Sequence, residues 1–291
     1  MGMRGVQWIL LALLASQPAC ALYARGSHMR LRGGTTAATT ILGPHRTRTA
    51  PYARPDSSMS DAERVYVVQA FSRSEVRKRF LTQVFAIIAA QLATTAGVMA
   101  AVRALPALLF FMARAAPLFL FAPLLPAFLL QMLLSTGENS SMQYVLLSVY
   151  TILQALALGL ATAALPGQLV LNAAGATTVA VGSLSVYALT TKRDFTVHGG
   201  MLAAGVTALL ALSIIQFFVK GSWVLLGRSY FGVLLFSGWL VYDLQQMMGG
   251  NKKEQARPNE PVKAAFSIFV DLVNIFVNIL QLMAANERRR D

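Results

Sequence analysis

Seven long apolar stretches follow one another between residues 80 and 285, separated by short breaks rich in polar residues, glycine and proline. Each stretch has about the 20 residues that an α-helix needs to cross the hydrocarbon core of a bilayer. The pattern therefore predicts an all-α membrane protein, a bundle of seven transmembrane helices. The expected spans are Phe80–Val102, Ala115–Leu134, Met142–Leu165, Leu169–Thr190, Gly199–Val219, Ser229–Met248 and Val262–Ala285.

The breaks between the spans carry their own signals. Arg103, Pro106 and Arg114 indicate a turn between the first two spans, and Gly249-Gly250 is a natural stop for the sixth. Glycine and alanine are dense in spans three to five, where we expect them to permit close helix packing. Prolines at three positions are expected to kink the second span or shorten its start: Pro117, Pro123 and Pro126.

Polar residues recur along the last span at intervals of four, three, four and three. This polar stripe consists of Ser267, Asp271, Asn274, Asn278 and Gln281. Such spacing puts all of them on one face of a helix. Because a stripe of this length should face protein or water rather than lipid, we expect the last helix to be central, with the others around it. Two roles stay open, namely hydrogen bonding between helices and a hydrated path.

The last two spans each contain one aspartate, Asp243 and Asp271. A carboxylate inside a membrane is costly, which favours a functional role. A rise of 1.5 Å per residue puts Asp243 about 9 Å and Asp271 about 14 Å from the same membrane edge, so the two carboxylates could meet. If they do, they would share one proton and form a pH-sensing site. A purely structural pair is the alternative.

The two aspartates also suggest which ion could pass. Oxygen ligands suit Ca²⁺, but two carboxylates supply only part of the roughly 6–8 oxygens that a bound Ca²⁺ takes. We therefore expect a transient contact of Ca²⁺ or another cation with Asp243 and Asp271 along an ion path. No tightly bound cofactor is predicted.

Composition agrees with this class of protein. Hydrophobic residues make up 56% of the chain and charged residues 13%, about half the charge of a soluble domain. The net charge is +13, but residues 1–55 contain seven arginines and no acid. Most of the excess therefore lies before the membrane domain, so the charge does not indicate a nucleic-acid partner; the lipid bilayer is the expected one.

The segments outside the spans have different characters. Residues 1–21 resemble a signal peptide, with Arg4, the apolar run Trp8–Ala15 and the cleavage pattern Ala19-Cys20-Ala21. Residues 22–60 are basic and transit-like, which predicts disorder, and residues 61–79 are a basic segment before the membrane. Residues 80–285 form the transmembrane domain and residues 286–291 a basic tail.

A signal-like segment followed by a transit-like one resembles the bipartite presequence of algae with plastids of secondary origin. This favours a plastid membrane. A mitochondrial inner membrane and the membranes of the endoplasmic reticulum and secretory pathway are the alternatives.

Three stretches, in this order and spacing, resemble the transmembrane Bax inhibitor motif family: Leu189–Gly205, Phe236–Gly250 and Phe266–Leu280. The resemblance implies a seven-helix bundle around a central last helix, and a pH-sensitive Ca²⁺ leak governed by two aspartates that fall on Asp243 and Asp271. In many leak-type members a base just after the second span pairs with an aspartate in the closed state. The corresponding loop here, Ser135–Ser141, contains no base.

Part of the same resemblance points to another function. The stretches TTKRDF and GGML are similar to the bacterial branch that modulates a membrane-bound AAA protease. They imply a non-conducting regulator of such a protease or of another membrane partner. A role in cell death or stress is implied by the family name alone.

An enzymatic role is not predicted. Tyr242-Asp243 matches the first half of the intramembrane aspartyl protease signature, whose second half needs Gly-x-Gly-Asp so that the substrate backbone can approach. This chain has Ile268-Phe269-Val270-Asp271 there, which is bulky.

Overall fold

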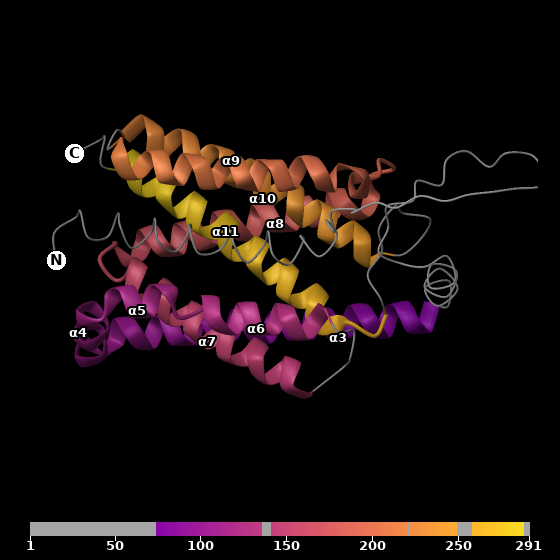
Figure 1. The fold of residues 1–291 in the computed structure, drawn as a ribbon, viewed down its shortest axis with the longest axis horizontal. Helices are drawn as coiled ribbons and strands as arrows, with labels where there is room; N and C mark the ends of the chain where they lie inside the picture. Colours follow the sequence, from indigo (N-terminus) through magenta and orange to yellow (C-terminus); the bar gives the residue numbers. More distant parts are fainter. Residues whose placement is uncertain (1–73, 136–140, 220–221, 249–257, 288–291) are drawn as a thin grey trace, which may run out of the picture.

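The computed structural model describes residues 74–135, 141–219, 222–248 and 258–287 (Figure 1). The signal-like and transit-like segments, residues 61–73 of the segment before the membrane, residues 136–140 of the loop after the second span, the Gly249-Gly250 stop and residues 288–291 of the tail lie outside the described residues. All regular elements of the described part are helices. They are α3 (Ser74–Ala104), α4 (Pro106–Arg114), α5 (Ala116–Phe121), α6 (Leu124–Ser135), α7 (Ser141–Thr162), α8 (Gly167–Thr190), the 3₁₀ helix η1 (Phe195–His198), α9 (Gly199–Phe218), α10 (Ser222–Met247) and α11 (Pro261–Glu287).

The helices supply seven segments that are long and apolar enough to cross a membrane, with α5 and α6 together forming the second. The predicted seven-helix membrane bundle is confirmed. The second span is interrupted at residues 122–123, which confirms the effect expected of its prolines. The protein is a multi-pass integral membrane protein.

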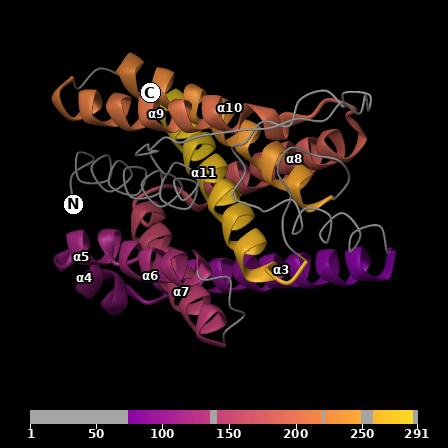
Figure 2. The same ribbon diagram turned by 45° about the vertical axis from the view of Figure 1, so that its right-hand side comes forward.

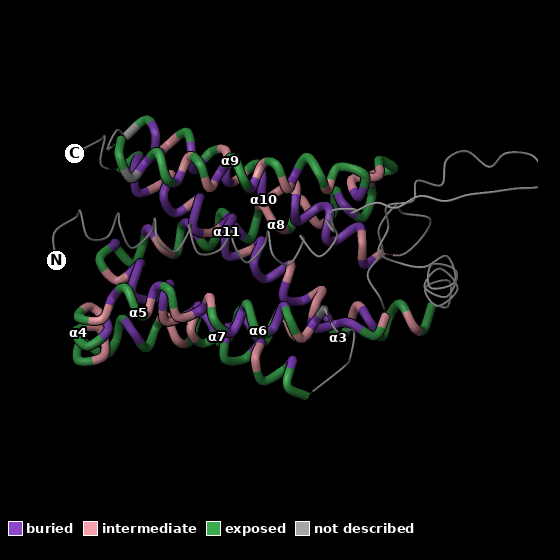
Figure 3. The backbone as a smooth tube through the Cα atoms, viewed as in Figure 1, coloured by how far each residue is buried: buried purple, intermediate pink, exposed green. Residues whose placement is uncertain are grey.

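The last helix is the centre of the bundle, as predicted. In its most apolar part, 72% of the residues of α11 are buried, against 17–22% for α3, α8 and α9. It packs most extensively on α10 and also contacts α3, α8 and α7. Figures 1 and 2 show α11, in yellow, running obliquely between a group made of α3–α7 and a group made of α8–α10. Figure 3 shows the same helix buried along most of its length.

Two apolar clusters pack against different faces of α11. One unites α3–α7 with a first face: Val262, Phe266, Phe269, Val270, Val273 and Val277. The other unites α8–α10 and the start of α3 with a second face: Ala265, Ile268 and Ile275. At 3.6 residues per turn, the polar stripe falls between these two faces. The stripe therefore runs along a line where the two halves of the bundle meet.

The prediction that Arg103, Pro106 and Arg114 indicate a turn between the first two spans is wrong. Residues 106–114 form the helix α4, with Pro106 at its start and Arg114 stacked over the Phe110 ring at 4.9 Å. Proline lacks the N–H that the first helical turn leaves unused, so it starts a helix as readily as it ends one.

The prediction that the sixth span starts at Ser229 is also wrong. Helix α10 begins at Ser222 rather than Ser229, and Arg228, which the sequence places at the flank of the span, lies inside the helix with only 1% of its surface exposed. The physical reason is that distant side chains accept hydrogen bonds from its guanidinium, as described below.

Candidate functional site: a buried polar stripe between oppositely charged ends

The polar stripe of α11 is enclosed by protein. Asp271 and the amides of Asn274, Asn278 and Gln281 are buried, and Ser267 is half-buried at the start of the stripe. Over the ten residues from Asp271 to Gln281 the helix rises about 15 Å. The stripe therefore covers half of the membrane thickness without facing lipid.

Two contacts define how α10 lies against this stripe. The Ser229 hydroxyl donates a hydrogen bond to Gln281 Oε1 over 2.9 Å. One turn along α10, a Cβ placed on Gly232 would overlap the side chain of Asn278. Three residues forward on α10 thus correspond to three residues back on α11, which is an antiparallel register, and only glycine leaves room for the amide at that level.

The same register places the two aspartates in one region of the bundle. Continued along α10, it brings Asp243 level with Ser267, one helical turn or about 6 Å along the axis from Asp271. Asp243 is 6% exposed and Asp271 is fully buried. Each has polar or electrostatic contacts within the protein. That the two carboxylates meet and share a proton stays a prediction.

The amides of the stripe are only partly satisfied. Asn274 Nδ2 donates to the Val270 carbonyl and Asn278 Nδ2 to the Asn274 carbonyl, each over 2.8 Å. The Oδ1 atoms of both asparagines are buried and accept no hydrogen bond from the described part of the chain. An acceptor left in this state costs about 1–3 kcal/mol, and water or a cation would satisfy it.

A basic side chain, Arg228, lies at the far end of the stripe, beside Gln281. Arg228 Nε donates to Gln216 Oε1 of α9 over 2.6 Å, and its Nη2 donates to Gln281 Oε1 of α11. Its Nη1 is buried and donates to none of the residues that the structure describes. The guanidinium therefore joins three helices through neutral amides.

A second glutamine supports the end near the aspartates. Gln245 lies two residues beyond Asp243 on α10 and is fully buried. Its Oε1 accepts from the Phe195 N–H over 2.8 Å, and its Nε2 donates to the Arg193 carbonyl over 2.9 Å. The backbone of the loop before η1 is thereby fixed to the helix that carries Asp243.

The stripe offers oxygen ligands rather than a closed metal site. Among the described residues, no three His, Cys, Asp or Glu side chains come together as a metal site would require. Carboxylate and amide oxygens are nevertheless the donors that Ca²⁺ and Mg²⁺ use. The donor set fits a passing hard cation better than a stored one.

Comparison with known proteins gives the family. A model of the family described as inhibitor of apoptosis-promoting Bax1 matches residues 77–288, which is most of the chain. The chain belongs to the Bax inhibitor family. The resemblance seen in the sequence, to the transmembrane Bax inhibitor motif proteins, is thereby confirmed.

Relatives from distant organisms match different shares of the chain. Protein LIFEGUARD 4 of Arabidopsis thaliana is 29% identical over 246 residues, covering 81% of this chain and 98% of the plant protein. Protein lifeguard 4 of Mus musculus is 28% identical over 81% of this chain and 97% of its own length. The Golgi anti-apoptotic protein of Vaccinia virus is 30% identical over 144 residues, which is 50% of this chain and 59% of the viral protein.

Three of the residues described above were not expected from the sequence. The predicted sixth span begins at Ser229, so Arg228 falls just outside it, and the sequence pattern does not single out Gln216 or Gln245. Each is a strongly polar residue within or beside a long apolar run, which is the signal that could have drawn attention to them.

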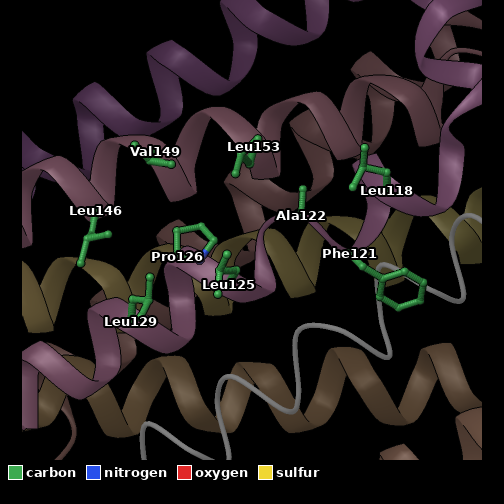
Figure 4. Close-up of a pocket in the computed structure, with 9 residues that line it drawn as sticks. All are labelled: Leu118, Phe121, Ala122, Leu125, Pro126, Leu129, Leu146, Val149 and Leu153. Atoms are coloured by element: carbon green, nitrogen blue, oxygen red, sulfur yellow. The ribbon is translucent and has the colours of Figure 1, made fainter.

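A separate apolar groove lies on the outer side of the bundle (Figure 4). It has a volume of about 540 Å³ and lies between α5–α6 and α7. Side chains such as Leu118, Leu125 and Val149 line it and are exposed. Its lining has no charged or hydrogen-bonding side chain, so it offers no ion path.

Proposed function

We propose that this member of the Bax inhibitor family is a pH-sensitive Ca²⁺ leak, with Asp243 and Asp271 controlling the passage of the cation. The observation that carries the proposal is the continuity between a fully buried carboxylate, Asp271, and the amide oxygens of Asn274 and Asn278 that lack donors. A helix that needed only to pack would satisfy these oxygens or replace them by apolar groups.

The aspartates supply the pH dependence. Two carboxylates about one turn apart in a low-dielectric region repel each other when both are ionised, and they attract when they share a proton. A shared proton would hold α10 against α11, whereas its loss would create a doubly negative site that attracts Ca²⁺. Proton occupancy and cation occupancy therefore exclude each other at this site.

Ca²⁺ flux in liposomes tests the proposal. Purified full-length protein is reconstituted with an enclosed Ca²⁺ indicator, and the influx rate is followed from about pH 6 to pH 8. We expect a pH-dependent rate in the wild type and a loss of both rate and pH dependence in Asp243→Asn plus Asp271→Asn. Glu75→Gln removes an exposed acid from the first turn of α3 and is the matched control. Wild-type behaviour of the double Asn variant would rule the proposal out.

A second candidate is a non-conducting regulator of a membrane-bound protease or another membrane partner. The observation that favours it is the loop Lys192–Asp194, whose two basic side chains are exposed while its backbone is bonded to Gln245. A fixed basic loop beside the membrane offers a recognition surface. Lys192→Glu plus Arg193→Glu should then abolish recovery of the partner from native membranes and leave Ca²⁺ flux unchanged. Recovery of no partner, together with robust flux, would count against it.

The organelle and the absence of enzymatic activity belong to the proposal as well. The arrangement of the amino-terminal segments supports a plastid or mitochondrial inner membrane, with the secretory membranes as the alternative. A fluorescent fusion of residues 1–60 would decide. We assign no catalytic residue, because Ile268, Phe269 and Val270 before Asp271 are all buried in the core and leave no space for a substrate backbone.

A further inference from the structure

We infer that Arg228 is a charge barrier at the far end of the polar stripe, which limits the passage of cations and sets the charge selectivity of the path. The inference rests on the proposed leak and adds a residue that opposes the passage of Ca²⁺.

The position of Arg228 puts its charge on the stripe. The guanidinium lies inside α10, is 1% exposed, and donates to Gln281, the last member of the stripe on α11. Ser229, the next residue on α10, donates to the same amide oxygen. A cation moving from Asp271 along the stripe would therefore meet the guanidinium at Gln281, about 15 Å further on.

A purely structural role does not account for the charge. The contacts of Arg228 are with the amide oxygens of Gln216 and Gln281, and a neutral amide could join the same helices. Burying an ionised group costs far more than burying an amide. By contrast, Arg103 keeps its side chain exposed and donates to the Thr162 and Leu165 carbonyls at the end of α7, which is an ordinary stabilising contact.

The buried environment also strengthens the effect of the charge. Coulomb repulsion grows as the local dielectric constant falls, and a divalent ion is repelled twice as strongly as a monovalent one. The unused donor of Nη1 points to the same sign of selectivity, because it could bond an anion but not a cation. The far end of the stripe therefore opposes the passage of Ca²⁺.

The test is a series of substitutions in the full-length protein, reconstituted in liposomes. R228Q removes the charge and should raise the Ca²⁺ influx rate about tenfold or more. R228K keeps the charge, and its influx rate should stay close to that of the wild type. Gln216→Glu places a carboxylate against the arginine from α9 without altering the stripe, and should raise the rate as R228Q does. In R228Q/Q281R the guanidinium returns from the opposite helix, and the rate should fall again.

Asp271→Asn separates this inference from the leak itself. A wild-type rate that depends on Asp271 but does not rise in R228Q or Gln216→Glu would overturn the barrier and leave the leak intact. An absence of flux in every variant, including R228Q, would overturn both. Equal rates in R228K and R228Q would show that geometry rather than charge matters, which also overturns the barrier.

Folding is checked by the unfolding temperature and elution volume of each variant. If R228Q proves unstable, Gln216→Glu and R228K provide the test, since both retain a basic side chain at position 228.

Discussion

The polar stripe has buried acids toward one end and a buried base at the other. At one end lie Asp271 and, one turn away in register, Asp243; at the other, ten residues along α11, Gln281 bonds Arg228. Between them lie asparagine oxygens without donors. On the proposed mechanism, a cation would be attracted at one end and repelled at the other. Burial alone does not say what a polar residue of the membrane interior does; the sign of the charge and its partners do.

The two ends are also supported differently. Gln245, near the aspartates, bonds the backbone of a loop at the edge of the bundle. Gln216, near the arginine, bonds a side chain and joins α9 to α10. The aspartate end is therefore bonded to a loop, whereas the arginine end is held by neighbouring helices.

The largest effect on stability is expected between the two ends, one helical turn from Gln281. Gly232→Val would drive a side chain into Asn278 and separate α10 from α11, costing up to about 3 kcal/mol. The measurement is unfolding in mixed detergent micelles. Gly227→Ala, at a glycine of the same helix with open space around it, is the control and should be neutral or stabilising by about 0.5–1 kcal/mol. Equal losses in the two variants would mean that the fit of Gly232 to Asn278 does not decide the effect.

A smaller loss is expected at the arginine end. Gln216→Leu removes the acceptor of Arg228 Nε and leaves part of a charged group unbonded, which should cost about 2 kcal/mol. Gln216→Glu keeps an acceptor there and should cost less. If the leucine variant unfolds like the wild type in the same micelles, Gln216 does not hold the arginine.

The smallest loss is expected at the aspartate end. Gln245→Leu breaks two hydrogen bonds to the loop, and hydrogen bonds within membrane proteins contribute about 1 kcal/mol each or less. Hydrogen exchange should show faster loss of the Phe195 amide proton. Gln168→Leu, the same substitution in an exposed pair with Asn172, is the comparison and should leave that proton protected.

Much of the architecture was predictable because lipid imposes a simple rule on sequence. A span must be long and apolar, so the seven segments followed from the pattern, and the polar stripe of α11 indicated the central helix. The place of an individual residue in the fold was harder to predict where one residue type has two structural uses. Pro106 was interpreted as a turn signal, yet it begins α4.

The arginine end was missed for a related reason. A base beside an apolar run normally marks the membrane surface, and the predicted sixth span began just after Arg228, at Ser229. The burial of Arg228 depends on Gln216 and Gln281, which lie 12 and 53 residues away. Periodicity within one helix cannot reveal such partners. The aspartates were easier to find, because each interrupts an apolar run well inside its span.

The most direct test of the account is one comparison of Ca²⁺ flux and its pH dependence in three proteins: wild type, Asp243→Asn plus Asp271→Asn, and R228Q. The account predicts that the double Asn variant loses flux and its pH dependence, while R228Q gains flux and keeps that dependence. A double Asn variant that leaks like the wild type, with the same response to pH, would contradict it.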